Sequence, residues 1–359
     1  MDAFKKILME NDINVPSNVE FKGMVYTIDG KPLDKGMIDF LKWVFVPVFQ
    51  STSGIIIPRT GEFKIDAEKI SPRTIINLSG LPNASASVLN EGLVQIYLGI
   101  LFVFSAISNT VDIIFSILDK GIISFENLLN FNPPDEILDE IDGLFHALKK
   151  SQESNWLHIF LPHIGEKNIN KHFVRITNGM ASIIIGHELT HWFETIYKKE
   201  AWDKKLAVVD DGIESWLNSE HVLVKKEKFE NAKAHLADKN IRKSWINEVN
   251  ADIGAFKYSQ NTATMGGWMR SPEILKETYI LLEFLFSIVH LFEIFNYKNG
   301  IKNNMSTHPP SVIRRSIFHH IAAKRFGMSE LDYANKQNGA GLAVRILMEV
   351  IIDKYLRER

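Results

Sequence analysis

Residues 187–191 read His-Glu-x-x-His, a spacing typical of zinc-dependent hydrolases. In an α-helix, His187 and His191 are one turn apart, so both rings project from the same face, about 5–6 Å apart at Cβ. Two imidazoles at that distance can bind one zinc ion. Glu188 lies at the edge of the same face, where it can take a proton from a water molecule on the zinc. We therefore predict that His187 and His191 are metal ligands and that Glu188 is a general base.

The motif lies in an apolar run that predicts a long helix over residues 168–199. Ile185, Leu189, Trp192 and Ile196 recur at helical spacing on the side opposite the histidines. This stripe would anchor the helix in a core and leave the other face free for chemistry. The alternative is a core helix in which two histidines align by chance.

A catalytic zinc site usually has three protein ligands, and the candidate for the third is Glu248. Glu248 and Asp252 are four residues apart on a helix predicted over 241–259, so they share one face. If Glu248 binds the metal, Asp252 can accept the free N–H of a ligand histidine, which fixes the tautomer of that ring. The small residue Ala251 would let the two helices approach closely. The alternative is an ordinary solvated pair of acids.

His308 precedes Pro309-Pro310, which opens a further predicted helix, and Arg314 lies in that helix. A histidine held near the metal can donate a hydrogen bond to a developing oxyanion. Arg314 can pair with Glu248 or Asp252 and hold the carboxylate in place. The alternative is a helix start with a surface arginine.

Three segments follow one another in the chain: His-Glu-x-x-His, Glu-x-Asn-Ala-Asp and Thr-His-Pro-Pro, with an arginine six residues after the last histidine. This order of motifs resembles that of the gluzincin peptidases of the HtpX type. Those enzymes are membrane proteins, and the order of parts is more similar to their soluble relatives, the Lit-type phage-exclusion peptidases of bacteria. The resemblance covers residues 88–320. It implies a zinc peptidase with ligands His187, His191 and Glu248, base Glu188, and supporting residues Asp252, His308 and Arg314.

The composition bounds the class of protein. The chain has 359 residues, 45% hydrophobic and 23% charged, which is a normal globular balance. The formal net charge of −2 provides no global basic field for nucleic acid. There is no cysteine, so a metal site must use histidine and carboxylate ligands.

Residues 1–87 match no motif of the family, and we expect them to form a separate N-terminal region with a β-hairpin at 55–65. A strand is predicted over 21–29, and residues 71–87, rich in Pro, Ser, Asn and Gly, are predicted to be a loop or linker. The peptidase domain would then span 88–359. No apolar segment of signal-peptide length is found near Met1, which favours a cytoplasmic protein.

The most apolar stretch is 92–118. Gln95, Asn109 and Asp112 interrupt it, and a membrane span needs about 20 apolar residues. We therefore predict a buried core helix there, with an integral membrane peptidase as the alternative. Further helices are predicted over 132–150, 272–297, 311–326 and 342–356.

The insertion 193–245 is longer than the family leads us to expect, and residues 203–239 within it read as charged and irregular, a composition suited to a contact surface more than to a core. Trp202 and Trp216 lie among its many charges. Both of its ends are tied to zinc-bearing helices, so we hypothesise that it flanks the cleft and restricts access to one protein substrate. Inert surface is the alternative.

These patterns predict a mainly α (α+β) protein with a zincin-like helical metallopeptidase core and a small β-containing N-terminal region. The predicted activity is hydrolysis of a peptide bond in a protein or peptide substrate, with Zn²⁺ as cofactor. The resemblance implies a role in bacterial defence against phage, with an activating partner left open. A non-catalytic zinc-binding module is the other alternative.

Overall fold

The structure is a computed structural model of the chain, and it describes a defined set of residues. The strands are described by their backbone pairing alone. The described residues are 27–28, 31–32, 73–77, 84–87, 93–97, 108–119, 125–151, 171–196, 199–219, 224–265, 272–301, 308–329, 332–333 and 339–359.

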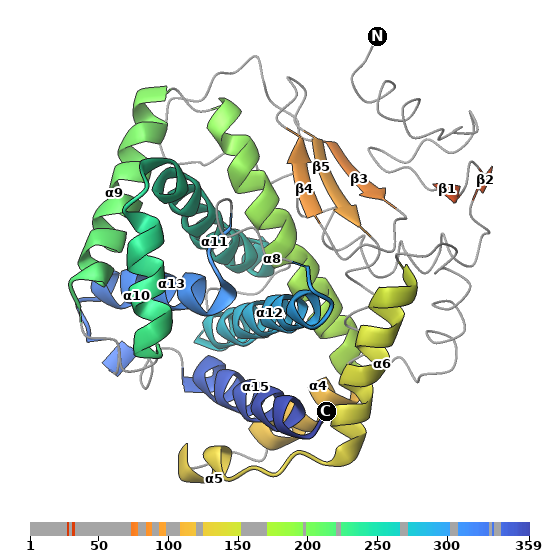
Figure 1. Ribbon diagram of the computed structural model, residues 1–359. Coiled ribbons are helices and arrows are strands. Elements are labelled where there is room, and N and C mark those ends of the chain that lie inside the picture. The colour runs from red at the N-terminus through yellow and green to blue at the C-terminus, as the bar shows by residue number, and fades with distance from the viewer. Residues whose placement is uncertain are drawn as a thin grey trace.

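The described part of the chain is mainly α-helical, as the sequence predicts (Figure 1). The helices are α4 (Ser108–Asp119), α5 (Phe125–Leu129), α6 (Asp135–Ser151), α8 (Lys171–Ile196), α9 (Lys199–Leu217), α10 (Lys226–Leu236), α11 (Lys239–Met265), α12 (Pro272–Lys298), α13 (Ser311–Arg325) and α15 (Gly339–Glu358). The predictions for α6, α8, α11, α12, α13 and α15 are confirmed in type, but α11 and α15 are longer and α8 is shorter than the sequence predicts.

Helix α8 lies in the core for much of its length. Ile185, Leu189 and Trp192 of the predicted stripe are at most 2% exposed, so the anchoring face is confirmed. Ile183 and Thr190 on other faces are buried as well. A helix buried on several sides must be covered by several neighbours. Its main neighbour is α11, and α4, α12 and the sheet described below also contact it.

Helix α11 begins where local chemistry predicts a start. The carboxylate of Asp238 accepts the backbone N–H of Asn240 at 2.8 Å and of Ile241 at 3.3 Å, which satisfies donors that the first helical turn leaves free. Trp245, Val249 and Ala251 of this helix are fully buried. The helix that carries Glu248 is therefore capped at its start and packed along its middle.

Helix α12 is the central helix, in contact with α8, α11, α13 and α15. Its segment Leu275–Lys298 is long and apolar enough to cross a membrane by length and composition, but 67% of the apolar window is buried inside the protein. Among the described residues it is the one such helix. Its burial against four helices explains its apolar composition as that of a core helix.

A small sheet lies beside α8, with strand order β3-β5-β4 (Figure 1). Strands β3 (Arg73–Asn77) and β5 (Leu93–Tyr97) are parallel, and β4 (Ala84–Ser87) runs antiparallel to β5. Two predictions are wrong here. Residues 71–87 contain two strands where a loop was expected, and 92–118 contain a strand followed by the shorter helix α4 where one core helix was expected.

The physical reason for both errors is that pairing partners lie outside the local sequence. Ile76 and Ala84 each pair with Ile96, and such contacts are set by the sheet, not by the periodicity of one segment. A short apolar run such as Leu93–Tyr97 fits a buried strand or a helix equally well. The sheet contains strands from both sides of residue 87, so it crosses the boundary predicted between the N-terminal region and the peptidase domain.

The N-terminal predictions are mostly untested. The hairpin at 55–65 lies outside the described residues. Strand β1 (Thr27–Ile28) falls within the range predicted as a strand and pairs antiparallel with β2 (Lys31–Pro32). Two strands of two residues are too short to define a folded region by themselves. The separate β-containing region therefore stays a prediction.

The described residues of the stretch 203–239 are mostly helical, which corrects the prediction of an irregular segment. Helices α9 and α10 cover the side of α11 that faces away from α8, and both also contact α13 (Figure 1). Trp202 and Trp216 are 4% and 0% exposed, so they are core residues and not the contact surface that we hypothesised. Trp202, Val209, Ile213 and Trp216 form a buried stripe at helical spacing that their charged neighbours obscure in the sequence.

Candidate metal centre

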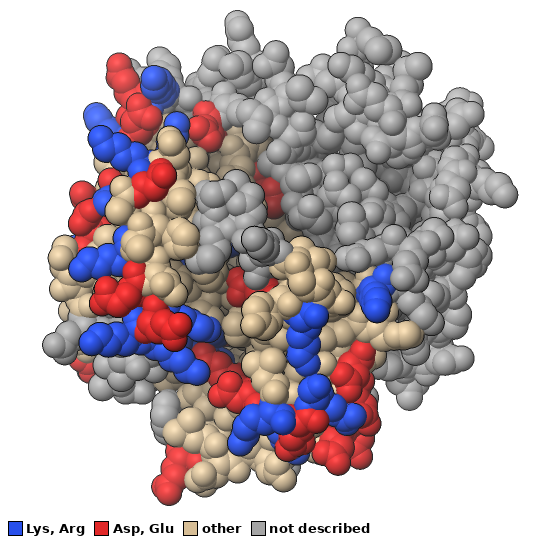
Figure 2. Space-filling view, viewed as in Figure 1, with Lys and Arg blue, Asp and Glu red and all other residues tan. Residues whose placement is uncertain are grey.

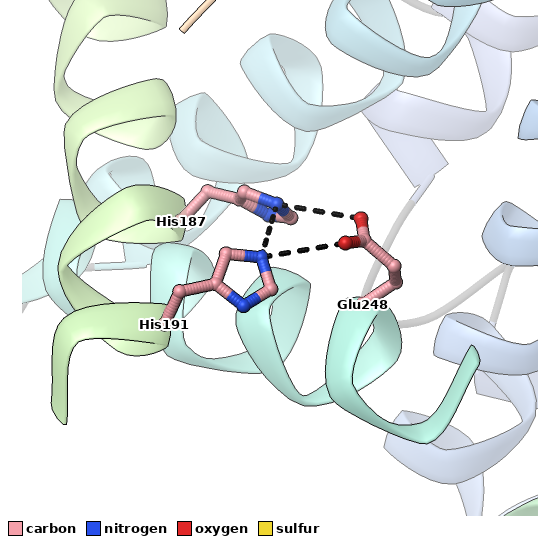
Figure 3. Close-up of side chains that lie close together, drawn as sticks. All are labelled: His187, His191 and Glu248. Carbon is pink, nitrogen blue, oxygen red and sulfur yellow. Dashed lines mark hydrogen bonds and ion pairs between the residues drawn. The ribbon is translucent and has the colours of Figure 1, made fainter. Parts of the chain in front are cut away.

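The two histidines of the motif lie as their spacing predicts. His187 and His191 project from α8 toward α11, and their Nε2 atoms are 3.2 Å apart (Figure 3). The rings meet edge to face, with centroids 4.8 Å apart. Both side chains retain some exposure, 12% for His187 and 25% for His191. Two ring nitrogens therefore converge on one point at the edge of the core.

Glu248 of α11 completes the group, as the sequence predicts. Its Oε2 lies 3.6 Å from Nε2 of His187, and its Oε1 lies 3.4 Å from Nε2 of His191 (Figure 3). One ligand atom from each residue lies within 4.8 Å of the other two. Two lone-pair nitrogens and one carboxylate at this separation could hold a metal ion.

The convergence depends on an unusually close approach of α8 and α11. A Cβ atom at Gly254 would lie 1.9 Å from Oγ1 of Thr190, and one at Gly186 would lie 2.8 Å from the Tyr258 side chain. Neither position can hold a larger residue unless the helices separate. The sequence suggested the small Ala251 for this role, and the two glycines were missed. A glycine inside each of two predicted helices was the available signal, because glycine there is otherwise destabilising.

Asp252 lies one turn beyond Glu248 and touches the other side of His187, as predicted. Its Oδ1 is 3.1 Å from Nδ1 of His187, and Asp252 is fully buried. A hydrogen bond donated by Nδ1–H to Asp252 leaves the lone pair of Nε2 directed at Glu248 and His191. This arrangement of carboxylate, histidine and metal position is the usual one in zinc proteins.

Arg314 holds Asp252 with two hydrogen bonds, from Nε to Oδ2 and from Nη2 to Oδ1, each 2.5 Å long. Nη2 also lies 3.2 Å from Nδ1 of His187, and Nη1 lies 3.4 Å from Oε2 of Glu248. The sequence left open whether Arg314 pairs with Glu248 or with Asp252. The structure shows that it contacts both, with the stronger geometry at Asp252.

Charges around the group shift the pKa values of its members. Burial alone would raise the pKa of Glu248, but hydrogen bonds from His187, His191 and His308 and the charge of Arg314 lower it. Burial lowers the pKa of His187, and hydrogen bonds to Asp252 and Glu248 reverse the effect and raise it to about 9. A cation at Nε2 of His187 would therefore replace a firmly held proton, so metal binding would release protons.

His308 lies on the solvent side of the group. Its side chain is 66% exposed, and its Nδ1 is 3.2 Å from Oε2 of Glu248. The structure therefore places His308 beside the group formed by His187, His191 and Glu248. An exposed ring at this place can be reached by a molecule that approaches from solvent.

Glu188 is 9% exposed and follows the ligand His187 on α8. Burial lowers the pKa of Arg314, but Asp252, Glu248 and Glu188 together raise it above its usual range. Glu188 is therefore within electrostatic range of the site. All seven predicted site residues are accounted for in one region, between α8, α11 and the start of α13.

A second buried charged cluster, which the sequence did not predict, lies between α12, α13 and α15. Its members are Glu283, Arg315, His319, Arg345 and Glu349. Arg315 donates to Glu283 at 3.3 Å and to Glu349 at 3.1 Å, and Arg345 donates to Glu349 at 2.9 Å. His319 also pairs with Glu283. We call this group the Glu283 cluster.

The described part of the surface carries mixed charge. Figure 2 shows Lys and Arg side chains interspersed with Asp and Glu over α9 and α10 and around the lower helices. One example is Arg242 of α11, which pairs with Asp210 and Glu214 of α9. A face with interspersed signs does not present the basic stripe that tracks a nucleic-acid backbone.

Comparison with protein-family models, with curated proteins and with solved structures finds no match to this chain.

Proposed function

We propose that this protein is a zinc-dependent endopeptidase. The observation that carries the proposal is the convergence of His187, His191 and Glu248 on one point, with Glu188 adjacent and His308 on the open side. Catalytic zinc sites keep three protein ligands and one open position, whereas structural sites are closed by a fourth ligand. Among the described residues, no fourth histidine or acid joins the group.

Zinc fits the donor set better than harder cations do. Zinc sites in proteins are commonly built from imidazole nitrogens and carboxylate oxygens. The two Nε2 atoms lie 3.2 Å apart, and a different oxygen of Glu248 lies near each of them, Oε2 at 3.6 Å from His187 and Oε1 at 3.4 Å from His191. Calcium and magnesium prefer oxygen ligands in larger numbers, and two imidazoles do not suit them.

When bound, the ion would polarise the scissile carbonyl and acidify the attacking water. Glu188 would accept the proton of that water and pass it to the leaving amine. Asp252 would hold His187 in the tautomer that directs Nε2 inward, and Arg314 would hold Asp252 and Glu248. His308 would donate a hydrogen bond to the oxyanion that develops on the carbonyl.

The proposals on fold, location, substrate and biological role rest on the resemblance to the Lit-type peptidases. It supports a zincin-like core, a cytoplasmic location, a protein substrate and a role in defence against phage. The membrane alternative loses its proposed span, because 92–118 contains a strand and a helix of 12 residues. The remaining alternative is a module that binds zinc without catalysis.

Glu188→Gln distinguishes catalysis from zinc binding alone. The variant should keep zinc, since Glu188 is not a ligand, and should lose peptide hydrolysis by about 10²–10⁴-fold, because amide nitrogen cannot act as a base. Zinc is measured by elemental analysis after reloading and dialysis. Hydrolysis is measured as new protein N-termini in a bacterial lysate and as release of dye from labelled casein.

The matched control is Glu194→Gln, which changes an exposed glutamate of the same helix and should keep zinc and hydrolysis. Two results would contradict the proposal. If the wild-type protein contains no zinc after reloading and dialysis, the proposed metal site is wrong. If the wild type and Glu188→Gln hydrolyse the substrate at equal rates, Glu188 is not the general base.

A further inference from the structure

The start of α13 has no cap of its own. Pro310 precedes its first residue and provides no side-chain hydrogen bond to the first turn. The first backbone N–H groups of a helix have no partner within the helix, and a buried start needs an acceptor from elsewhere. Ser311, the first residue of α13, is 1% exposed. Its N–H group therefore requires a partner inside the protein.

Glu293 of α12 provides that partner. Its Oε1 accepts the backbone N–H of Ser311 at 2.6 Å, and its Oε2 accepts the hydroxyl of Ser311 at 2.8 Å. His290, one turn earlier on α12, lies 3.1 Å from the same Oε2 through Nδ1. A carboxylate at a helix N-terminus also interacts favourably with the positive end of the helix dipole. A single side chain of α12 thus holds the first turn of α13.

This first turn carries two residues of the metal centre. The N–H of Arg314 donates to the carbonyl of Pro310 at 2.9 Å, which is the first hydrogen bond within the helix. His308 precedes the same turn by two prolines. His308 contacts Glu248, and Arg314 contacts both Glu248 and Asp252. A shift of the first turn would therefore move both side chains relative to the metal ligands.

The part of α13 that follows the first turn is fixed separately, by Arg315 and His319 against Glu283 of α12. The pairs Ser311–Glu293 and His319–Glu283 show that the two helices run in opposite directions along their contact. The Glu283 cluster can hold the body of α13 without its first turn. Loss of Glu293 would therefore release the N-terminal turn and leave the rest of the helix in place.

We propose that Glu293 is a positioning residue of the metal centre, acting through Ser311 to hold His308 and Arg314 against Glu248 and Asp252. Its importance for hydrolysis rests on the proposed zinc peptidase function, but its effect on the geometry of the site does not. His290 supports Glu293 in this role. None of these three residues, Glu293, Ser311 and His290, belongs to the motifs that the sequence brought forward.

The test uses a graded series of variants in the full chain. Glu293→Ala removes both acceptor oxygens. Glu293→Gln retains one carbonyl oxygen and loses the charge, and Ser311→Ala removes only the hydroxyl donor. Ile141→Val is the stability control, since Ile141 is a 1% exposed core residue of α6 and loss of one methylene there costs about 0.5–1.5 kcal/mol.

The first readout is the visible absorption spectrum of protein loaded with Co²⁺, which reports the arrangement of the ligands. Glu293→Ala should change the spectrum, Glu293→Gln should change it less and Ser311→Ala least, while Ile141→Val should leave it unchanged. The kcat for labelled casein should fall about 10–100-fold in Glu293→Ala with KM little changed, as expected for misplaced catalytic groups.

The second readout needs neither metal nor activity. In ¹⁵N-labelled, metal-free protein, the ring signals of His308, assigned by their loss in His308→Ala, should shift in Glu293→Ala and stay in place in Ile141→Val. If wild-type protein binds no Co²⁺ and cleaves nothing, the proposed function fails, and this measurement alone decides the role of Glu293. Unchanged His308 signals in Glu293→Ala would overturn the proposal.

Discussion

Arg314 and Arg315 are neighbours on α13, and they enter two buried clusters built from the same residue types. Arg314 joins His187, Glu248 and Asp252 at the metal centre. Arg315 joins the Glu283 cluster. Each cluster contains arginine, histidine and carboxylates at hydrogen-bond distance. Residue types and burial alone do not distinguish the two.

What differs is the direction of the lone pairs. At the candidate metal centre, two ring nitrogens and a carboxylate converge on one point, and the arginine bonds to Asp252 and also contacts Glu248. In the Glu283 cluster, the carboxylate of Glu283 is paired directly with Arg315 and His319. Convergence of lone pairs leaves a position for a cation, and direct pairing fills it.

Exposure also differs between the centres of the two clusters. His308 and His191 have side chains 66% and 25% exposed, so the candidate metal centre opens to solvent. In the Glu283 cluster, the side chains of Glu283 and Arg315 are 1% and 2% exposed, and Glu349, at 45%, is the member that faces solvent. A buried charge pair contributes mainly to the choice of one packing arrangement. The contrast supports the proposed metal site at the first cluster and a role for the second in the alignment of α12, α13 and α15.

The largest effect is expected from Arg315→Ala. Removing this cation leaves Glu283 buried with fewer partners, which should lower the free energy of unfolding by about 3–5 kcal/mol. Zinc binding should be unchanged in the folded variant. Urea unfolding and elemental analysis measure the two quantities, with the exposed Arg357→Ala of α15 as the control. If Arg315→Ala lowers the free energy of unfolding by less than about 1 kcal/mol, the ion pairs of the Glu283 cluster contribute no more than exposed surface pairs do.

The Glu283 cluster should also make the protein sensitive to acid. Burial raises the pKa of Glu283, but His319, Arg315 and Arg345 lower it from 4.5 to about 2. Because the pKa is lower in the folded state, this stabilisation is fully present above pH 4.5 and is lost as the pH falls toward about 2. It amounts to roughly 3 kcal/mol.

Urea midpoints measured across this pH window test the prediction. The reference is Glu283→Gln, in which the titrating group is absent, so the difference between the two proteins isolates its contribution. That difference should shrink steadily on acidification. A difference that does not vary with pH would show that the pKa of Glu283 is the same in the folded and unfolded proteins.

A smaller effect is expected from Asp252→Asn, measured as zinc affinity by competition with a chelator. The amide cannot hold His187 and Arg314 as the carboxylate does, so affinity should fall about 10–100-fold without being lost. Glu349→Gln makes the same type of change in the Glu283 cluster and should leave affinity unchanged. If Asp252→Asn and the wild type bind zinc with equal affinity, Asp252 does not support the metal site.

The sequence by itself determined what depends on local spacing. The helical period places His187 and His191 on one face, and Glu248 and Asp252 on another, whatever surrounds them. Proline pairs before residues 135 and 311, and acids in the first turn of α6, mark helix starts that the structure confirms. Local spacing and residue type are therefore enough to name the seven residues that the structure brings together at the candidate metal centre.

Only the tertiary structure decided which of these faces meet and how closely. Gly254 against Thr190 sets the separation of α8 and α11, and Glu293 sets the first turn of α13, though neither stands out in its own segment. The same holds for Trp202 and Trp216, whose charged neighbours predict surface and which the packing of α9 buries. Contacts between residues distant in sequence are fixed by the whole set of neighbours, and no periodicity within one segment carries that information.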